Sequence, residues 1–147
     1  MSSSGDMRPE PPAVGTGRAR PVVLIVDDDV DALEALSQVL EEADYDVVRA
    51  ANGLEALGQL GDRGGRCDLI LLDLMMPVMN GWDFRRKQMA ITAFAGIPVV
   101  LMSAGARMAT VDLGAAGYVA KPVEVPDLLS TIAQVLLRSV PDRRSLP

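Results

Sequence analysis

The chain has 147 residues, of which 49% are hydrophobic, and this composition suits a single globular domain with short tails. Its net charge of −6 argues against a nucleic-acid-binding domain, which would normally present a basic face. Because the sequence has no histidine, it has no Ser-His-Asp triad, no histidine acid or base, and no metal site that uses histidine.

The two ends of the sequence differ in composition from the part between them. Residues 1–20 are rich in Ser, Gly, Pro and Arg, so we expect a flexible tail there, and residues 141–147 should form a shorter tail. Residues 21–140 are expected to fold as one domain. Cys67 is the single cysteine, expected to be a small, partly buried side chain, so no intramolecular disulfide can form. The sequence has no signal-peptide pattern and no apolar run of membrane-spanning length, and the expected location is the cytoplasm.

Between the tails, the apolar pattern alternates between strand-like and helix-like. Residues 22–26, VVLIV, form a continuous apolar run, which is typical of a strand covered on both faces, and residues 30–42 carry leucines at helical spacing. The later segments repeat this alternation, with strands expected at 46–50, 68–72, 97–102 and 117–120 and helices at 52–60, 81–93, 106–116 and 125–139. In the helix at 52–60, Leu54, Leu57 and Leu60 lie on one side. Five strands alternating with five helices predict an α/β fold, a flavodoxin-like doubly wound parallel sheet in the order 2-1-3-4-5.

Polar side chains stand at the carboxyl ends of these predicted strands. They are Asp27, Asp28 and Asp29 after the first strand, Asp73 after the third, Ser103 after the fourth, and Lys121 with Pro122 after the fifth. In a doubly wound sheet the functional crevice lies beyond the carboxyl ends, where the strand order reverses. We therefore expect these groups on one rim of the sheet.

Three of the aspartates need an explanation beyond helix capping. Asp29 is well explained as the N-cap of the following helix, but one helix start needs only one cap. Clustered carboxylates such as Asp27, Asp28 and Asp73 either raise a pKa or gather a cation, and Mg²⁺ is the hard ion that prefers oxygen ligands. A carboxylate can also be a nucleophile that forms an aspartyl phosphate, and Asp73 is the best candidate. Ser103 or Lys121 alone would more often be a structural or solvated side chain, but beside such a cluster both become candidate partners of a phosphoryl group.

Four motifs give the sequence its resemblance to a known family. VDDD at 26–29, LLDLMMPVMNG at 71–81, VVLMSA at 99–104 and GYVAKPV at 117–123 resemble the receiver domain of two-component response regulators. The resemblance covers about residues 21–140, and its motifs are specific jointly rather than one by one. It implies a domain that is phosphorylated on an aspartate in the presence of Mg²⁺.

The resemblance also implies roles for single residues. Asp73 matches the phosphoacceptor. Asp28 and Asp73 would bind Mg²⁺ directly, together with the backbone carbonyl of Met75, while Asp27 would act through a bound water.

The remaining roles concern the response to the phosphoryl group. Ser103 matches the switch hydroxyl, Lys121 would pair with a phosphoryl oxygen, and Tyr118 matches the aromatic switch residue, which would turn inward as Ser103 moves. Loop-shaping roles fall on Pro77, Gly81 and Pro122, with a cis Lys121–Pro122 peptide, and modulation of autodephosphorylation falls on Met75 and Gly105.

One feature departs from the family pattern. Eighteen residues separate Ser103 from Lys121, about one helical turn fewer than the family leads us to expect. The missing turn should come from the fourth helix, at 106–116, whose glycines also make it a poor helix. The resemblance makes this helix part of the output face, so its shortening affects how a partner docks.

The leading hypothesis is a stand-alone receiver domain, since no effector domain follows residue 140. It would be phosphorylated on Asp73 by a sensor histidine kinase or a histidine phosphotransfer protein, with Mg²⁺ as cofactor, and would signal through contact with a downstream protein, not a nucleic acid or a membrane. We expect no enzyme activity beyond its own phosphorylation and dephosphorylation. The alternatives are an interaction module that does not use phosphate and a small Mg²⁺-dependent phosphatase, with an FMN-binding flavodoxin further behind. Trp82, expected half-exposed at a helix start, would report Mg²⁺ by fluorescence quenching.

Overall fold

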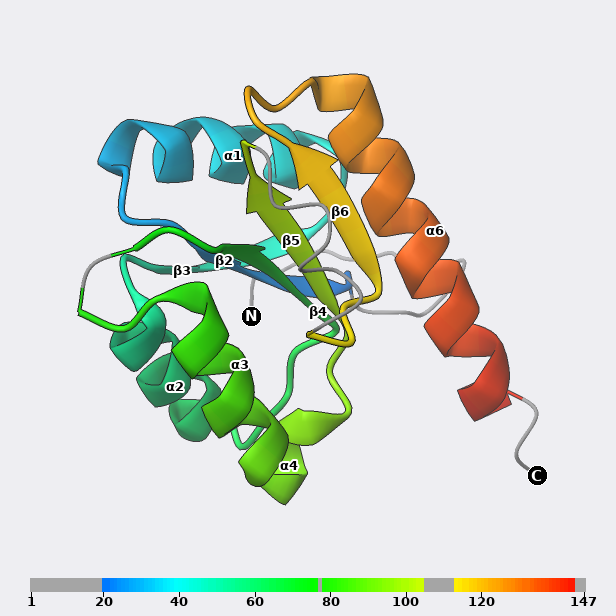
Figure 1. Cartoon of the computed structure of the whole chain (residues 1–147). Helices are drawn as coiled ribbons and strands as arrows, with labels where there is room; N and C mark the ends of the chain where they lie inside the picture. Colours follow the sequence, from blue (N-terminus) through cyan, green and yellow to red (C-terminus); the bar gives the residue numbers. More distant parts are fainter. Residues whose placement is uncertain (1–19, 77, 105–112, 145–147) are drawn as a thin grey trace, which may run out of the picture.

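The described part of the chain is built around one parallel sheet. The computed structural model describes residues 20–76, 78–104 and 113–144. Its strands are β2 (Val22–Val26), β3 (Asp46–Ala50), β4 (Leu69–Asp73), β5 (Val99–Ser103) and β6 (Gly117–Ala120). They lie in the order β3-β2-β4-β5-β6, with every neighbouring pair parallel (Figure 1). In chain order this is 2-1-3-4-5, so the predicted flavodoxin-like topology is confirmed.

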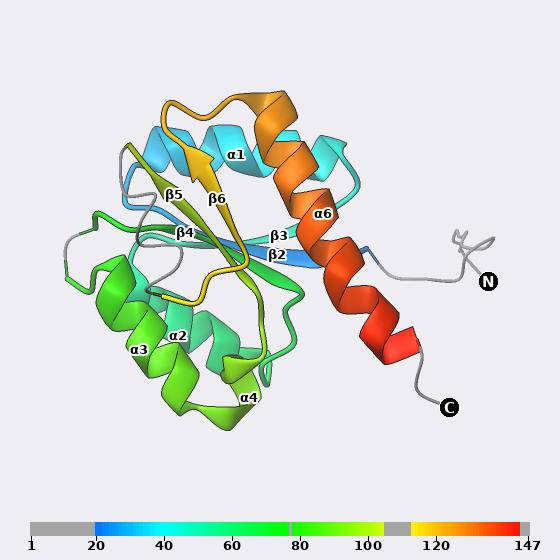
Figure 2. The ribbon, with the colours of Figure 1, turned by 45° about the vertical axis from the view of Figure 1, so that its right-hand side comes forward.

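Helices cover both faces of this sheet. Within the described residues they are α1 (Val30–Glu42), α2 (Gly53–Asp62), α3 (Gly81–Ala90), α4 (Thr92–Ala95) and α6 (Val125–Arg144). Helices α1 and α6 lie on one face, and α2, α3 and α4 lie on the other (Figures 1 and 2). None of these helices is long and apolar enough to cross a membrane.

The buried side chains of the strands divide between the two faces. In β2, Val23 and Ile25 pack with the leucines of α1 and with α6, whereas Leu24 and Val26 pack with α2 and α3. Successive side chains of a strand point to opposite faces, so a strand covered on both sides must be apolar at every position. This explains why the central strands read as unbroken apolar runs.

Several element boundaries differ from the prediction, most clearly the ends of α3 and α6. Helix α3 ends at Ala90 instead of continuing to residue 93, because Ile91 adopts an extended backbone and a separate short turn of helix, α4, follows. The amide of Gln88 supports this break by donating to the carbonyls of Phe94 and Ile97. The last helix, α6, continues to Arg144, past residue 139 where the sequence predicted its end. Pro141 has no backbone N–H, so this last part of α6 has one helical hydrogen bond fewer.

Only residues 113–116 of the helix predicted at 106–116 belong to the described part of the chain. Residues 113–116 form a turn and a bend instead of helix. Gly114 has a φ of +63°, a left-handed conformation that favours glycine and ends regular helix. Residues 106–112 lie outside the described residues, as do Gly105 and Pro77, so the expected shortening of this helix stays a prediction.

Candidate functional site

The site lies at the carboxyl rim of the sheet, where four strands end. Asp27 directly follows β2, Asp73 is the last residue of β4, Ser103 is the last residue of β5, and Lys121 directly follows β6. The sequence placed Asp73 just beyond its strand, and the structure includes it as the final strand residue. Because β4 lies between β2 and β5, these ends are neighbours in space although they are far apart in the chain.

Three carboxylates converge at this rim. Asp27, Asp28 and Asp73 each offer an oxygen, and these oxygens all lie within 4.8 Å of one another. Asp27 and Asp73 are buried, while Asp28 is exposed. The cluster therefore has a buried floor and one open side, and its hard oxygen donors fit a divalent cation such as Mg²⁺.

Lys121 joins the two buried carboxylates. Its Nζ lies 3.2 Å from Oδ2 of Asp27 and 3.3 Å from Oδ2 of Asp73. The cis Lys121–Pro122 peptide, as the sequence predicts, follows this contact directly. The ammonium thereby separates two carboxylates that would otherwise face each other without a counter-charge.

The backbone orients the two buried carboxylates in the same way. Oδ1 of Asp27 accepts the N–H of Asp29 at 3.0 Å, and Oδ1 of Asp73 accepts the N–H of Met75 at 3.1 Å. Each aspartate thus bonds the backbone two residues ahead, as in an Asx turn, and directs its other oxygen at Lys121. Both side chains are held by their own loops before any ligand binds.

Burial and charge shift the pKa values of these groups. Burial raises the pKa of Asp73, and the nearby Asp27 raises it further, while the Met75 N–H and Lys121 lower it, and the net effect is upward. Burial alone would lower the pKa of Lys121, but Asp27 and Asp73 together raise it above its ordinary value. Lys121 is therefore charged at neutral pH, and Asp73 holds a proton more readily than an exposed aspartate.

Asp29 has a different role from its two neighbours. Its carboxylate accepts the N–H of Asp31 at 3.0 Å and that of Ala32 at 3.3 Å, which caps the start of α1. The sequence predicted this cap. Of the three consecutive aspartates, only Asp27 and Asp28 belong to the carboxylate cluster.

Gly81 brings helix α3 into direct contact with the loop after Asp73. A Cβ atom at this position would lie 2.8 Å from Cα of Leu74 and 3.0 Å from the carbonyl oxygen of Asp73. The Gly81 N–H also donates to the carbonyl of Leu74 at 3.0 Å. Backbone packs on backbone here, which only glycine permits.

Tyr118 lies beside the end of β5. Its hydroxyl donates to the backbone carbonyl of Ser103 at 2.9 Å, and the N–H of Lys121 donates to the same carbonyl at 3.0 Å. The hydroxyl of the half-buried Tyr118 thus already meets the backbone at the switch position, while Ser103 itself is buried. Of the residues that the sequence proposed for this site, Asp27, Asp28, Asp73 and Lys121 lie together, and Ser103 and Tyr118 meet at the neighbouring strand end. The exposed Met75 side chain points away from the core.

Sequence reasoning missed an apolar border around this rim. The described residues that form it are the exposed side chains of Val30, Leu54, Met75, Val78 and Val125, which we call the apolar rim. Leu54 is the instructive case, because its helical spacing with Leu57 and Leu60 predicts a shared buried side, yet Leu54 is 59% exposed. Gly53 and Ala56 of the same turn are buried, but Leu54 lies about 120° around the helix from Leu60 and so faces away from the sheet.

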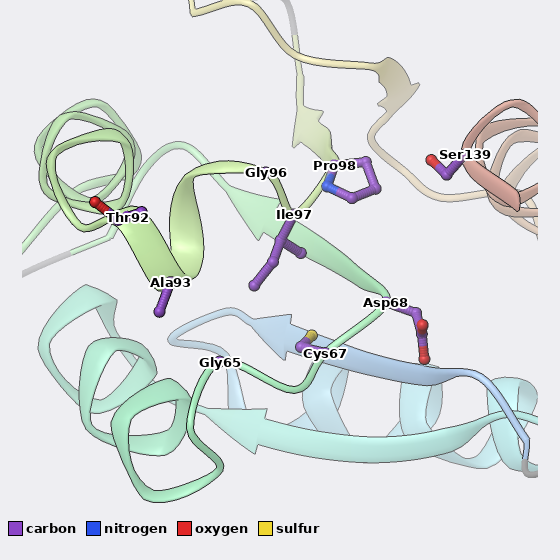
Figure 3. A pocket seen from close by; sticks show the side chains of 9 residues that line it. All are labelled: Gly65, Cys67, Asp68, Thr92, Ala93, Gly96, Ile97, Pro98 and Ser139. Atoms are coloured by element: carbon purple, nitrogen blue, oxygen red, sulfur yellow. The ribbon is translucent and has the colours of Figure 1, made fainter. Parts of the chain in front are cut away.

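The opposite end of the sheet has a separate hollow of about 440 Å³ (Figure 3). Cys67, Asp68 and Pro98 border it at the amino ends of β4 and β5, so it is unrelated to the carboxylate cluster. Burial raises the pKa of the Cys67 thiol, which donates to the carbonyl of Leu69 at 3.2 Å. Cys67 is a partly buried packing residue, as its sequence context suggests.

Comparison with known proteins extends these observations. Residues 23–133 match the family described as the response regulator receiver domain. A transcriptional regulatory protein CpxR homolog from Haemophilus influenzae is 36% identical over 121 residues, which cover 80% of this chain and 51% of the homolog. The transcriptional regulatory protein CusR from Escherichia coli is 38% identical over 122 residues, covering 79% of this chain and 51% of CusR. The chain thus spans about half the length of the curated relatives it matches.

Solved structures show the same fold. The chemotaxis protein CheY4 from Vibrio cholerae superimposes with a TM-score of 0.73 and 30% sequence identity, covering 80% of this chain and 99% of that one. The signal receiver domain of a signal transduction histidine kinase from Syntrophus aciditrophicus gives a TM-score of 0.72 and 30% identity, covering 79% and 89% of the two chains.

Proposed function

The chain belongs to the response regulator receiver domain family, and from this premise we propose that it is a switch controlled by phosphorylation of Asp73. The proposal rests on the position of Lys121. Its ammonium bridges Asp73 and Asp27, two of the three clustered carboxylates. A nucleophile, a cation site and a counter-charge for the phosphoryl group thereby meet at one point. We further propose Mg²⁺ as the cation, a phosphohistidine protein as the donor, and the cytoplasm as the location.

The carboxylates are the groups that would hold the cation. Oxygens of Asp28 and Asp73, with the backbone carbonyl of Met75, would bind Mg²⁺ directly, and the more deeply buried Asp27 would act through water. The bound ion would neutralise charge that develops on the transferred phosphoryl group. The Asx turns at Asp27 and Asp73 fix the two carboxylates in advance, so little reorganisation is needed when the ion and the donor arrive.

The transfer itself needs few groups. An oxygen of Asp73 forms the new P–O bond as the P–N bond of the phosphohistidine breaks, and the departing imidazole keeps the electron pair and takes up a proton. Lys121 then pairs with a phosphoryl oxygen in place of the Asp73 carboxylate. The hydroxyl of Ser103 donates a hydrogen bond to another phosphoryl oxygen. Ser103 carries this change to Tyr118, because the Tyr118 hydroxyl is bonded to the Ser103 carbonyl.

The apolar rim supports a protein as the phosphoryl donor. Exposed apolar side chains that surround a polar site are typical of a protein-binding surface. Beside the carboxylates, a hollow of about 320 Å³ runs between α1 and the segment after Lys121, with Ala32, Val39 and Val123 among its lining residues. A small donor such as acetyl phosphate would need only the carboxylates, whereas a helical donor protein would also cover the rim.

Labelling with acetyl phosphate tests the proposal. The wild-type protein with Mg²⁺ should gain one phosphoryl group by intact mass, and chelation of Mg²⁺ or the Asp73→Asn substitution should abolish the gain. Asp83→Asn, an aspartate of α3 outside the cluster, is the matched control and should label normally. If neither acetyl phosphate nor any histidine kinase labels the wild-type protein, the alternative of an interaction module that does not use phosphate is favoured. Multiple turnover of a phosphate monoester would instead indicate a phosphatase.

A further inference from the structure

Arg85 is a buried arginine that the carboxylate site does not explain. It lies on α3, its residue is only 7% exposed, and the run RRK at 85–87 gives no sign that it differs from its neighbours. Its guanidinium bonds two consecutive carbonyls: Nε donates to Leu113 at 2.9 Å and Nη2 donates to Gly114 at 3.0 Å. Burial lowers the pKa of Arg85, and within the described residues no carboxylate lies in ion-pair distance of it. The planar fork, whose geometry also suits a carboxylate, is used here to bind two backbone carbonyls.

A second polar side chain holds this guanidinium in place. Nη1 of Arg85 donates to Oε1 of Gln88 at 2.7 Å, and Nε2 of the fully buried Gln88 donates to the carbonyls of Phe94 and Ile97 at 2.9 and 3.0 Å. Gln88 thus connects the guanidinium to the turn of α4 and to the start of β5. Gln88 fixes the orientation of the Arg85 guanidinium. The guanidinium in turn fixes the positions of the Leu113 and Gly114 carbonyls.

Those carbonyls belong to the turn that leads into β6. Gly114 holds a φ of +63°, and two residues later the N–H of Ala116 donates to the carbonyl of Val99 at 2.8 Å. Tyr118 follows in β6, four residues after Gly114, and Lys121 comes directly after that strand. Arg85 therefore anchors the chain just before the strand that carries both Tyr118 and the approach to Lys121.

The other end of α3 contacts the phosphoacceptor loop. Gly81, one helical turn before Arg85, packs its Cα on the backbone of Leu74 and the carbonyl of Asp73. Gly81 contributes no side chain of its own to this contact, so the helix backbone rests directly on the loop. A displacement of the loop after Asp73 would be transmitted to α3 as a rigid unit, and from α3 through Arg85 to the turn before Tyr118.

We propose that Arg85 is a positioning residue that couples the Asp73 loop to Tyr118 through α3. This inference rests on the proposed function, because it concerns the response to a phosphoryl group at Asp73. It adds a second connection, on the α3 side of the sheet, to the one that runs through Ser103. Without Arg85 the acceptor site would still fill, but Tyr118 would respond less.

The aromatic composition of the chain allows both ends of this connection to be read at once. The sequence has one tryptophan, Trp82, which lies on α3 beside Gly81, and two tyrosines, Tyr118 and Tyr45. With fluorotryptophan and fluorotyrosine incorporated, fluorine NMR gives three resonances. Trp82 reports on the acceptor side, Tyr118 reports on the switch, and Tyr45 serves as an internal reference. Beryllofluoride with Mg²⁺ serves as the phosphoryl analogue. In the wild-type protein, the Trp82 and Tyr118 resonances should both shift on titration, while Tyr45 stays in place.

The decisive variant is Arg85→Met, with Arg86→Met as the matched control. Arg86 is the next residue of α3, is exposed, and pairs only with Asp83 among the described residues, so its loss should leave both responses unchanged. In Arg85→Met we expect beryllofluoride affinity, read at Trp82, to stay within about threefold of wild type, while the Tyr118 shift falls to about half or less. A role in stability alone would lower the melting temperature and leave the Tyr118 response intact.

Each outcome decides the question. A full Tyr118 shift in Arg85→Met overturns the inference and leaves the proposed function standing. If neither Trp82 nor Tyr118 responds in the wild-type protein, the proposed function fails and this inference fails with it. A displaced Tyr45 resonance would reveal that Arg85→Met does not fold, and Arg85→Lys then takes its place. Lysine keeps the charge, but its single nitrogen cannot reproduce the three nitrogens with which Arg85 binds Leu113, Gly114 and Gln88. Arg85→Lys should therefore also show a reduced Tyr118 shift, and a full shift would overturn the inference.

Discussion

At the scale of single residues, the site is governed by a mismatch of charge. The carboxylates of Asp27, Asp28 and Asp73 carry three formal negative charges, and the ammonium of Lys121 offsets one, which leaves two. A divalent cation matches that remainder. Without the cation, two buried carboxylates share one ammonium. Burial raises the pKa of Asp73, so Asp73 is the carboxylate that takes up a proton. Protons and the proposed Mg²⁺ would therefore compete for the same oxygens.

This competition predicts how stability depends on pH. Between the ordinary aspartate pKa of 3.8 and the raised pKa of Asp73, the folded chain holds more protons than the unfolded chain, so the contribution of Asp73 to stability falls as pH rises through that window. Without Mg²⁺, the free energy of unfolding of the wild-type protein, minus that of Asp73→Asn, should fall as the pH rises across this window. Saturating Mg²⁺ should remove the fall. Urea unfolding over a pH series measures this difference. A difference that does not change with pH would show that folding does not raise the pKa of Asp73.

At the scale of elements, each loop of the carboxyl rim combines a structural and a chemical task. The turn from β2 to α1 uses Asp29 to cap the helix and keeps the side chain of Asp28 exposed at the carboxylate cluster. The turn from β4 to α3 uses the Asp73 carboxylate to close an Asx turn and Gly81 to let the helix approach. Two adjacent aspartates can therefore differ in their effect when they are replaced: one substitution should mainly affect stability, the other the cation site.

The two neighbouring aspartates Asp28 and Asp29 provide the test. Asp29→Ala should lower the free energy of unfolding by about 1 kcal/mol through the lost cap and leave Mg²⁺-dependent labelling by acetyl phosphate largely intact. Asp28→Ala should abolish that labelling with little loss of stability in the absence of Mg²⁺, because it removes an exposed charge from a repulsive cluster. Urea unfolding and intact mass of both variants measure the pair. Equal loss of labelling in the two variants would mean that the cap, too, positions the cation.

At the scale of the whole molecule, the apolar residues that remain exposed are unevenly placed. Among the described residues, five of the eight exposed large apolar side chains form the apolar rim around the carboxylates. The other three lie away from it: Met89 and Ile91 at the end of α3, and Leu137 on α6. The carboxyl rim thus presents a polar centre with an apolar border. Such a border favours a protein donor over a small one, because burial of apolar surface contributes to binding only if the partner is large enough to cover it.

Charge substitutions on the apolar rim should separate the two kinds of donor. Leu54→Lys and Val78→Lys should each lower kcat/KM for transfer from a phosphorylated histidine kinase by about tenfold, since a lysine in the contact must be desolvated or displaced. Labelling by acetyl phosphate should stay at the wild-type rate. Leu137→Lys, equally exposed but distant, is the control and should leave both reactions unchanged. Equal loss with both donors would place the defect in the site itself.

Much of the fold and the site followed from local patterns. Unbroken apolar runs predicted the strands, leucine spacing predicted α1, and the position of polar residues at strand ends predicted which side chains meet. The cap at Asp29 was also predictable, because it depends only on the backbone within one turn. These features are encoded over a few residues, and short-range periodicity is what a sequence displays directly.

The tertiary structure decided which of several similar side chains became buried, paired or exposed. Lys121 meets Asp27 across 94 residues of chain, Arg85 is buried while Arg86 is exposed, and Leu54 remains exposed while Leu60 packs in the core. In each case residues of one type sit in comparable local sequence, and distant elements determine their surroundings. Burial and charge pairing depend on what the rest of the chain brings alongside, so they are properties of the packed molecule and not of the segment that carries the residue.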